Sequence, residues 1–170
     1  LHPEFSFLPR KFKIAVTGSQ ADRAAIGVHD IGLRLVRDDA GGLGFAVWAG
    51  GGQGRTPRVA AKLRDFVEAE ELLGYLSAIL RVYNLHGRRD NKYKARIKIL
   101  VESLGPEAFA REVEAEYARL GNGALRIPRE EIARVGAFFP EPAPDHRPAE
   151  RADDPAFDAW AARSLKPHKV

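Results

Sequence analysis

Two lysines separated by a single residue form the first group of side chains that could do chemistry together. Lys11 and Lys13 lie in the run RKFKIAVT, whose alternation predicts a β-strand that ends before Gly18. Alternate residues of a strand share a face and lie roughly 7 Å apart. Two neighbouring ammonium groups repel each other, so the pair suits either a solvated edge strand or an anion held between the two.

A second group of cations is concentrated in residues 86–98, the basic segment. It contains six Lys or Arg residues and one acid, a local charge of +5 in a chain whose net charge is +4. The cations are Arg88, Arg89, Lys92, Lys94, Arg96 and Lys98. Because the rest of the chain sums to −1, the positive charge is local, which favours an anionic ligand over a generally cationic surface.

Helical periodicity predicts that this segment runs into a helix over residues 90–104. Arg88, Lys92 and Arg96 would then line one face, and Tyr93 would lie inside. Cations near a helix N-terminus oppose the macrodipole, so the helix would gain from contact with a polyanion. A solvated face, or contact with nucleic-acid phosphates, remains an alternative interpretation.

A glycine-rich run follows an apolar strand. Four of the five residues 50–54 are glycine, and Arg55 and Arg58 come directly after. Exposed backbone N–H groups with two guanidinium groups could hold an oxyanion. The run is neither a Walker A loop nor a dinucleotide-binding fingerprint, and a flexible loop is the alternative.

Other kinds of site are poorly supported. The chain has no Cys and no Met, which excludes disulfides and thiolate metal sites within it. The five histidines show no metal-ligand spacing, so we predict no metal ligand in this chain. No Ser-His-Asp arrangement and no convincing acid/base pair of carboxylates is found.

The remaining elements are predicted from hydrophobic periodicity and from the turn and capping residues between the periodic segments. Strands are predicted over residues 28–37 and 43–49, joined as a hairpin, and helices over 56–66, 68–85 and from Pro106 to about residue 120. Residues 140–149 contain four prolines and read as a linker. Asp154-Pro155 predicts the start of a short last helix.

The chain begins at Leu1 rather than Met, so we expect it to be processed or part of something longer. No apolar run is long enough to span a bilayer, and residues 1–8 lack the pattern of a secretory signal. The cytoplasm is therefore the default expectation for its location, with no membrane partner.

Taken in order, these motifs resemble the sulfite/nitrite reductase haemoprotein family over roughly residues 5–120. The resemblance rests on LPRKFK at 8–13, WAGGGQGRTPR at 48–58, and RRDNKYKARIK at 88–98 with the LVESLG that closes the apolar stretch after it. It implies an α+β fold, a mixed α/β sheet packed by helices, and two cofactors, sirohaem and a [4Fe-4S] cluster. The cluster's cysteine ligands would lie outside this chain.

The resemblance also implies a domain organisation. Residues 1–137 would form the sirohaem- and substrate-facing α/β domain of the first half of such an enzyme. Residues 138–152 would be a proline-rich linker, and residues 153–170 the start of the ferredoxin-like portion of the second half.

By the same resemblance, Lys11 and Lys13 would be the catalytic residues, binding sulfite or nitrite and helping to deliver protons. Sirohaem carries eight carboxylates, which would explain the self-repelling basic segment. Its binding residues would be Arg10, Gly50, Gly51, Gly52, Arg55, Arg58, Arg89, Lys92 and Arg96. The pair Asp90-Asn91 departs from the Asp-Arg common in the family, which leaves the roles of Arg88, Arg89 and Lys92 interchangeable.

The leading interpretation is part of an assimilatory sulfite reductase, not catalytic alone, with nitrite reductase as the close alternative. Its partners would be the remainder of the polypeptide and ferredoxin or an NADPH-linked flavoprotein as electron donor. A basic nucleic-acid-binding module is the alternative of another class, disfavoured because surface aromatics are scarce in the basic segment. A purely structural repeat is the third. The leading interpretation requires the two cationic segments to lie together and to open onto a common hollow.

Overall fold

The structure is a computed structural model that describes residues 3–121, 125–140 and 154–166. It divides into two units, residues 1–138 and 139–170. The strands are β1 (Ile14–Thr17), β2 (Ile31–Arg37), β3 (Leu43–Ala49) and β4 (Ala61–Glu68). The helices are α1 (Leu72–His86), α2 (Ile97–Leu104), α3 (Pro106–Arg119), α4 (Arg129–Gly136) and α5 (Pro155–Ser164). Short 3₁₀ turns span Pro3–Phe5, Ile26–Val28, Ala69–Glu71 and Lys92–Lys94.

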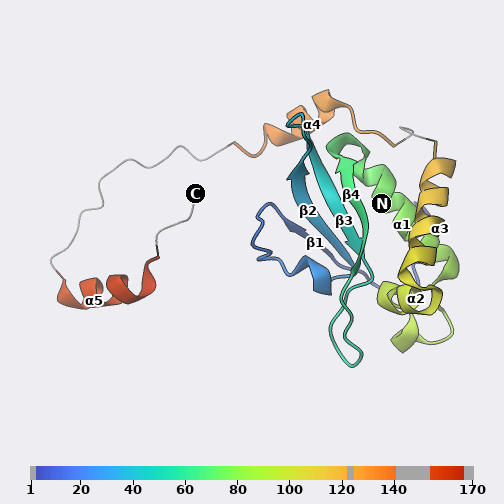
Figure 1. Cartoon of the computed structure of the whole chain (residues 1–170), viewed down its shortest axis with the longest axis horizontal. Helices are drawn as coiled ribbons and strands as arrows, with labels where there is room; N and C mark the ends of the chain where they lie inside the picture. Colours follow the sequence, from blue (N-terminus) through green and yellow to red (C-terminus); the bar gives the residue numbers. More distant parts are fainter. Residues whose placement is uncertain (1–2, 122–124, 141–153, 167–170) are drawn as a thin grey trace. The chain divides into compact units, whose positions relative to one another are not determined.

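The four strands form one mixed sheet in the order β1-β2-β3-β4 (Figure 1). β1 runs parallel to β2, and the other two pairings are antiparallel. The predicted hairpin between β2 and β3 is confirmed. Its turn is closed by the Asp38 carboxylate, which accepts hydrogen bonds from the backbone of Ala40 and Gly42, and Gly41 adopts a φ of 83°.

Helices α1, α2 and α3 cover one face of the sheet (Figure 1). The core between them contains strand residues such as Ile31 and Val47 and helix residues such as Ile79 and Phe109, all essentially fully buried. Alternate residues of β2 and β3 supply the sheet's side of this core, as period-two patterning requires. The α+β fold implied by the resemblance is confirmed.

The helix predicted over residues 56–66 is wrong, because Ala61–Glu68 is strand β4. The register between β3 and β4 shifts around Val47, so β4 does not keep a strict alternation of buried and exposed residues. The helix was predicted from the apolar residues Ala60, Ala61, Leu63 and Phe66, whose spacing imitates a helix. The hydrogen bonds that pair this segment with β3 make it a strand.

The helix predicted over residues 90–104 is correct only in its second part. Asn91 accepts a hydrogen bond from the backbone N of Tyr93 at 2.9 Å and starts a 3₁₀ turn, and Arg96 is extended before α2 begins at Ile97. Arg88, Lys92 and Arg96 therefore do not line a helical face. Tyr93, predicted inside, is 74% exposed.

Other predicted helix boundaries differ from the observed ones by a few residues. The predicted helix 68–85 is the turn Ala69–Glu71 followed by α1, and the helix predicted from Pro106 is α3. Helix α4 was not predicted. In the second unit, Asp154 caps α5 as expected, accepting a hydrogen bond from the backbone N of Ala156 at 2.9 Å. Most of the predicted linker lies outside the described residues.

In the part of the chain that the structure describes, none of the helices is long and apolar enough to cross a membrane.

Candidate functional site

The strand segment, residues 10–13, lies against the basic segment although about eighty residues separate them in the sequence. The Arg10 Nη1 atom donates to the backbone carbonyl of Lys92 at 2.7 Å. The Tyr83 hydroxyl, fully buried in α1, lies 3.0 Å from the Arg10 carbonyl and 2.7 Å from the Ala95 carbonyl. Burial raises the pKa of Tyr83, so the phenol stays protonated and can donate its one hydrogen to either of these oxygens. The structure thus brings together the two segments that the sequence analysis linked.

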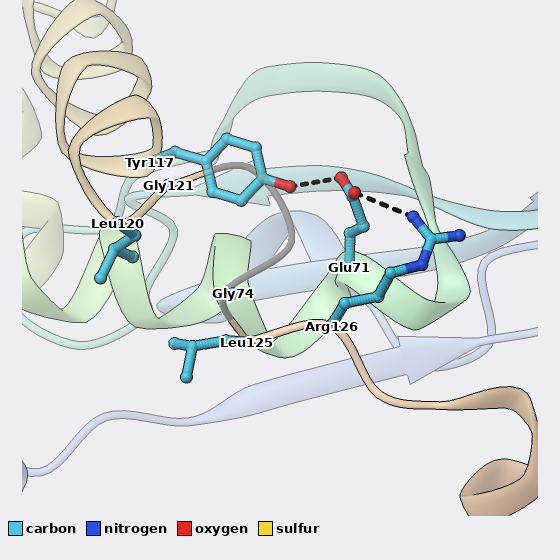
Figure 2. A pocket seen from close by; sticks show the side chains of 7 residues that line it. All are labelled: Glu71, Gly74, Tyr117, Leu120, Gly121, Leu125 and Arg126. Atoms are coloured by element: carbon cyan, nitrogen blue, oxygen red, sulfur yellow. Dashed lines mark hydrogen bonds and ion pairs between the residues drawn. The ribbon is translucent and has the colours of Figure 1, made fainter.

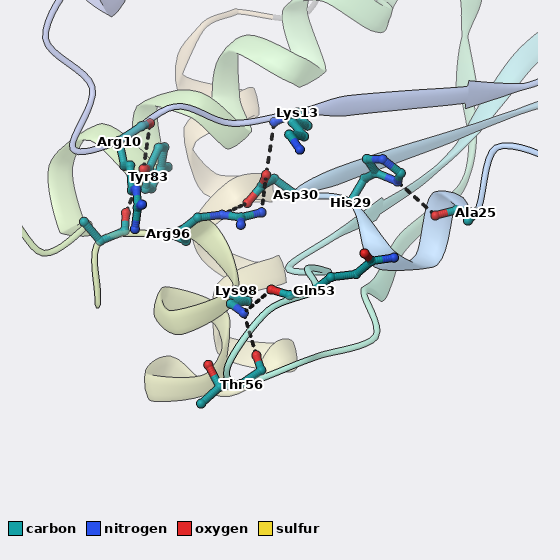
Figure 3. Close-up of polar contacts among 11 residues, drawn as sticks. Arg10, Lys13, Ala25, His29, Asp30, Gln53, Thr56, Tyr83, Arg96 and Lys98 are labelled. Atoms are coloured by element: carbon teal, nitrogen blue, oxygen red, sulfur yellow. Dashed lines mark hydrogen bonds and ion pairs between the residues drawn. The ribbon is translucent and has the colours of Figure 1, made fainter. Parts of the chain in front are cut away.

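A buried carboxylate makes the second connection between them (Figure 3). Asp30, just before β2, has a side chain that is 1% exposed. Its Oδ1 accepts from Arg96 Nε at 2.9 Å, and its Oδ2 accepts from Arg96 Nη2 at 2.7 Å and from the Lys13 backbone N at 3.0 Å. The sequence analysis missed Asp30; the only available signal was a lone acid at the entrance to a buried strand.

Lys11 and Lys13 precede β1 rather than lying within it. Both side chains are exposed, and neither ammonium group makes an ion pair among the described residues. Lys11 and Arg10 line an open hollow of about 360 Å³. The rest of that lining comes from Phe5, Ser6, Leu8 and Phe12, so neither Lys13 nor the basic segment contributes to it. The hollow therefore differs from the shared one that the sequence analysis required.

Several cations of this surface have only neutral partners within the described residues. Arg10 donates to the carbonyl of Lys92, and Arg89 donates to the carbonyls of Phe7 and Asn84. The Lys92 ammonium lies 5.3 Å from the Tyr93 ring centroid. Arg88, by contrast, is paired with Asp90 at 2.5 Å. Because the charges of Arg10, Arg89 and Lys92 are not offset by carboxylates, this surface fits a polyanionic ligand.

The glycine run is packed against the chain itself. A Cβ on Gly50 would lie 2.8 Å from the Val101 side chain, and one on Gly51 would lie 2.5 Å from the carbonyl oxygens of Gly27 and His29. A Cβ on Gly52 would lie 2.9 Å from Lys98 Cδ and 3.2 Å from Arg96 Nη2. These buried glycines therefore let the loop approach the 3₁₀ turn Ile26–Val28 and α2 closely.

Lys98 holds the same loop from α2. Its buried ammonium donates to the carbonyls of Gln53 at 3.0 Å and Thr56 at 2.5 Å (Figure 3). Desolvation, followed by the nearby charge of Arg96, lowers the pKa of Lys98. The sequence analysis counted Lys98 in the basic segment without assigning it a role.

The two remaining predicted residues lie on the outside of the loop. Arg58 forms an ion pair with Glu102 of α2, and Arg55 is exposed. Within the described residues, no hydrogen bond or ion pair links either of them to the strand segment or to Arg96. The structure therefore brings together Arg10, Lys13, Lys92, Arg96 and the glycine run, and it leaves Arg55 and Arg58 apart from them.

A small hollow of about 10 Å³ lies elsewhere, between α1 and the end of α3 (Figure 2). Glu71 on its wall accepts hydrogen bonds from the Tyr117 hydroxyl and from Arg126. Burial, together with Glu71, raises the pKa of Tyr117 to about 12. With its polar groups paired and so little space, this hollow belongs to the scaffold.

Comparison with known proteins identifies the class. Residues 1–120 match the family described as nitrite and sulphite reductase 4Fe-4S domain, and the chain belongs to this family. The resemblance inferred from the motifs is thereby confirmed. The cofactors of the family are those that the motifs implied, sirohaem and a [4Fe-4S] cluster.

Individual relatives carry the names of both activities. The chain is 34% identical to "Sulfite reductase [ferredoxin] 1" of Mycolicibacterium paratuberculosis, covering 79% of this chain and 24% of that protein. It is 39% identical to the assimilatory ferredoxin-dependent nitrite reductase of Haloferax mediterranei, covering 66% and 20%. The solved NirA protein of Mycobacterium tuberculosis matches with a TM-score of 0.62 and 31% identity, covering 69% of this chain and 21% of that one. The chain thus spans about a quarter or less of these relatives.

Proposed function

We propose that this chain forms the sirohaem- and substrate-facing part of an assimilatory sulfite reductase, which reduces sulfite to sulfide with six electrons. The observation that carries the proposal is the contact between the strand segment and the basic segment, at a surface where Arg10, Arg89 and Lys92 lack carboxylate partners among the described residues. A surface of this kind is stabilised by an anionic ligand, and a carboxylate-rich macrocycle with its oxyanion is such a ligand.

In this proposal Lys11 and Lys13 act on the substrate. Both ammonium groups are exposed, so they are available to bind the oxygens of sulfite. Reduction removes those oxygens as water and consumes protons, and a cation that donates a proton at the departing oxygen favours S–O cleavage. The lysines would therefore bind the oxyanion and supply protons in turn.

Arg10, Arg89, Lys92 and Arg96 would hold the carboxylates of sirohaem. When bound, sirohaem and its coupled cluster would pass electrons from the donor to the substrate. With no cysteine in the chain, cluster ligands would have to come from elsewhere in the protein. Gly50, Gly51 and Gly52 would shape the floor of the site by their close packing, and Arg55 and Arg58 would contribute from its margin.

We further propose that residues 1–137 form this domain, that 138–152 serve as a linker, and that 153–170 open the next portion. The electron donor would be ferredoxin, supported by the names of the Mycolicibacterium and Haloferax relatives. The NADPH-linked alternative is supported by the NADPH haemoprotein component of Shewanella sediminis, which is 36% identical.

Nitrite reductase is the second candidate. It is favoured by the 39% identity to the Haloferax protein, whose printed name states that activity. The same lysines would serve nitrite, because it too is a small oxyanion whose reduction consumes protons.

The test uses the purified native protein. Its visible spectrum is expected to show haem-type bands, and its turnover with a reduced one-electron donor is expected to be faster with sulfite than with nitrite. The absence of haem-type bands would contradict the whole proposal. Faster turnover with nitrite would replace the first candidate with the second.

A further inference from the structure

We propose that Asp30 is a positioning residue of this site, which sets the guanidinium of Arg96 and the backbone of Lys13 so that both cations serve one anionic ligand. The proposal rests on the proposed function for the identity of that ligand. The role of Asp30 follows from geometry that the sequence motifs do not contain.

Asp30 fixes the orientation of Arg96. Bidentate contacts of 2.9 and 2.7 Å use Nε and one hydrogen of Nη2. A guanidinium has five N–H donors, so the Nη1 group and the second Nη2 hydrogen stay available. Gly52 makes room for this orientation, because a Cβ there would lie 3.2 Å from Nη2.

Asp30 also fixes the start of β1. Its Oδ2 accepts from the Lys13 backbone N at 3.0 Å, while the Lys13 carbonyl accepts from the Ile31 backbone N at 3.1 Å. The Lys13 backbone is therefore held on both sides by residues 30 and 31, and its exposed side chain leaves from a fixed point. Displacing Asp30 would move both cations at once.

The charge of Asp30 fits this role. A carboxylate that is 1% exposed is costly unless it is paired, and Arg96 supplies the pair. Arg96 in turn lies close to Lys98, and Asp30 offsets their repulsion. Asparagine would keep the shape but present N–H groups where Arg96 or Lys13 donates, so at least one donor would face another donor.

Glu114 on α3, whose side chain is 40% exposed, offers a control that is matched in its number of donors. It accepts hydrogen bonds from Arg64 Nε and Nη2 and from the Tyr75 hydroxyl, which equals the three donors that Asp30 receives. It lies outside the strand segment and the basic segment. Glu114→Gln therefore removes a comparable set of bonds from the same fold away from the proposed ligand.

The experiment compares wild type, Asp30→Asn and Glu114→Gln in the native protein. It measures bound sirohaem from the visible bands, the dissociation constant for sulfite from their shift at equilibrium, and the thermal midpoint. We expect both variants to melt earlier. Only Asp30→Asn should weaken sulfite binding or sirohaem retention, by roughly tenfold, the usual cost of losing a group that orients a ligand's first contacts.

The outcomes separate the two proposals. If wild type holds sirohaem but Asp30→Asn matches Glu114→Gln in sirohaem content and sulfite affinity, Asp30 is only structural and this inference is overturned. If wild type holds no sirohaem, the proposed function fails and takes the inference with it. Should Asp30→Asn not fold, Gly52→Ala displaces both Lys98 and Arg96 while leaving Asp30 intact. The same tenfold loss is then expected, and unchanged affinity would contradict the proposal.

Discussion

Two carboxylates in this molecule share the same bidentate contact with an arginine but lie in different surroundings. Around Asp30, the bidentate partner Arg96 belongs to a segment whose other cations mostly face neutral groups. Around Glu114, the partner Arg64 lies between two tyrosine rings, 4.7 Å from the centroid of Tyr75 and 5.0 Å from that of Tyr117. The first cluster leaves positive charge in excess, and the second is balanced.

The difference in surrounding charge indicates the role of each cluster. Arg64 comes from β4, Glu114 from α3 and Tyr75 from α1, so the balanced cluster fastens two helices to the sheet. The Asp30 cluster also connects elements distant in sequence, but it does so beside Lys13, whose charge no carboxylate offsets in the described part of the chain. An ion pair that only stabilises needs no excess charge nearby, whereas an anion-binding site does.

The largest effect is expected from removing the excess positive charge at the proposed site. Lys11→Ala and Lys13→Ala should each lower turnover of sulfite by roughly 10²–10⁴-fold, because each removes a proton donor and a contact to the oxyanion. Steady-state kinetics on the native protein measure this. Lys62→Ala, which removes an exposed lysine paired with Asp65 on β4, is the control and should keep wild-type turnover. Unchanged turnover in both test variants would remove the lysines from the site.

The sequence predicted the family well and the structural setting of these lysines poorly. The motif order led to the correct family and the α+β fold, and period-two patterning located β2 and β3. The pairing of β4 with β3 was missed, because a register shift near Val47 disturbs the alternation on which strand prediction depends. Charge alone suggested a helical face of Arg88, Lys92 and Arg96, although Asn91 starts a separate turn there.

Asp30 and Tyr83 show why the rest of the candidate site could not be predicted. Each joins segments far apart in the chain partly through backbone atoms: the N–H of Lys13 for Asp30, beside its Arg96 partner, and the carbonyls of Arg10 and Ala95 for Tyr83. Backbone partners leave no residue type to recognise. Only the folded arrangement reveals that a buried acid and a buried phenol hold the two cationic segments together.

The second-largest effect is expected from disrupting the balanced cluster around Glu114. Arg64→Ala should lower the free energy of unfolding by about 2 kcal/mol, because Glu114 loses its charged partner and two tyrosine rings lose a cation–π contact. Urea denaturation followed by circular dichroism measures this. Sulfite affinity per folded molecule should not change. A loss of affinity as large as that of Asp30→Asn would erase the distinction between the clusters.

A smaller effect is expected from removing the Tyr83 hydroxyl, which makes another contact between the strand segment and the basic segment. Tyr83→Phe keeps the buried ring and removes the hydroxyl that lies between the Arg10 and Ala95 carbonyls. The loss of unfolding free energy should be about 1 kcal/mol, the net value of one such hydrogen bond. Sulfite affinity should fall less than in Asp30→Asn, because Arg10 still reaches the Lys92 carbonyl. Urea denaturation and the visible titration measure the two quantities, and a larger affinity loss than in Asp30→Asn would make Tyr83 the principal positioning residue.

The smallest expected effect is a pH dependence to which the balanced cluster contributes through Glu114. Burial acts to raise the pKa of Glu114, but hydrogen bonds from Arg64 and Tyr75 outweigh it and hold the pKa below its usual 4.5. A carboxyl whose pKa is lowered by folding contributes stability above its unfolded pKa, and that contribution is lost as the pH falls through the folded value. Urea midpoints of wild type should therefore fall as the pH drops below 4.5, and Glu114→Gln should flatten part of that decline. If the variant declined as steeply as wild type, Glu114 would not be the group whose protonation loosens α3 from the sheet.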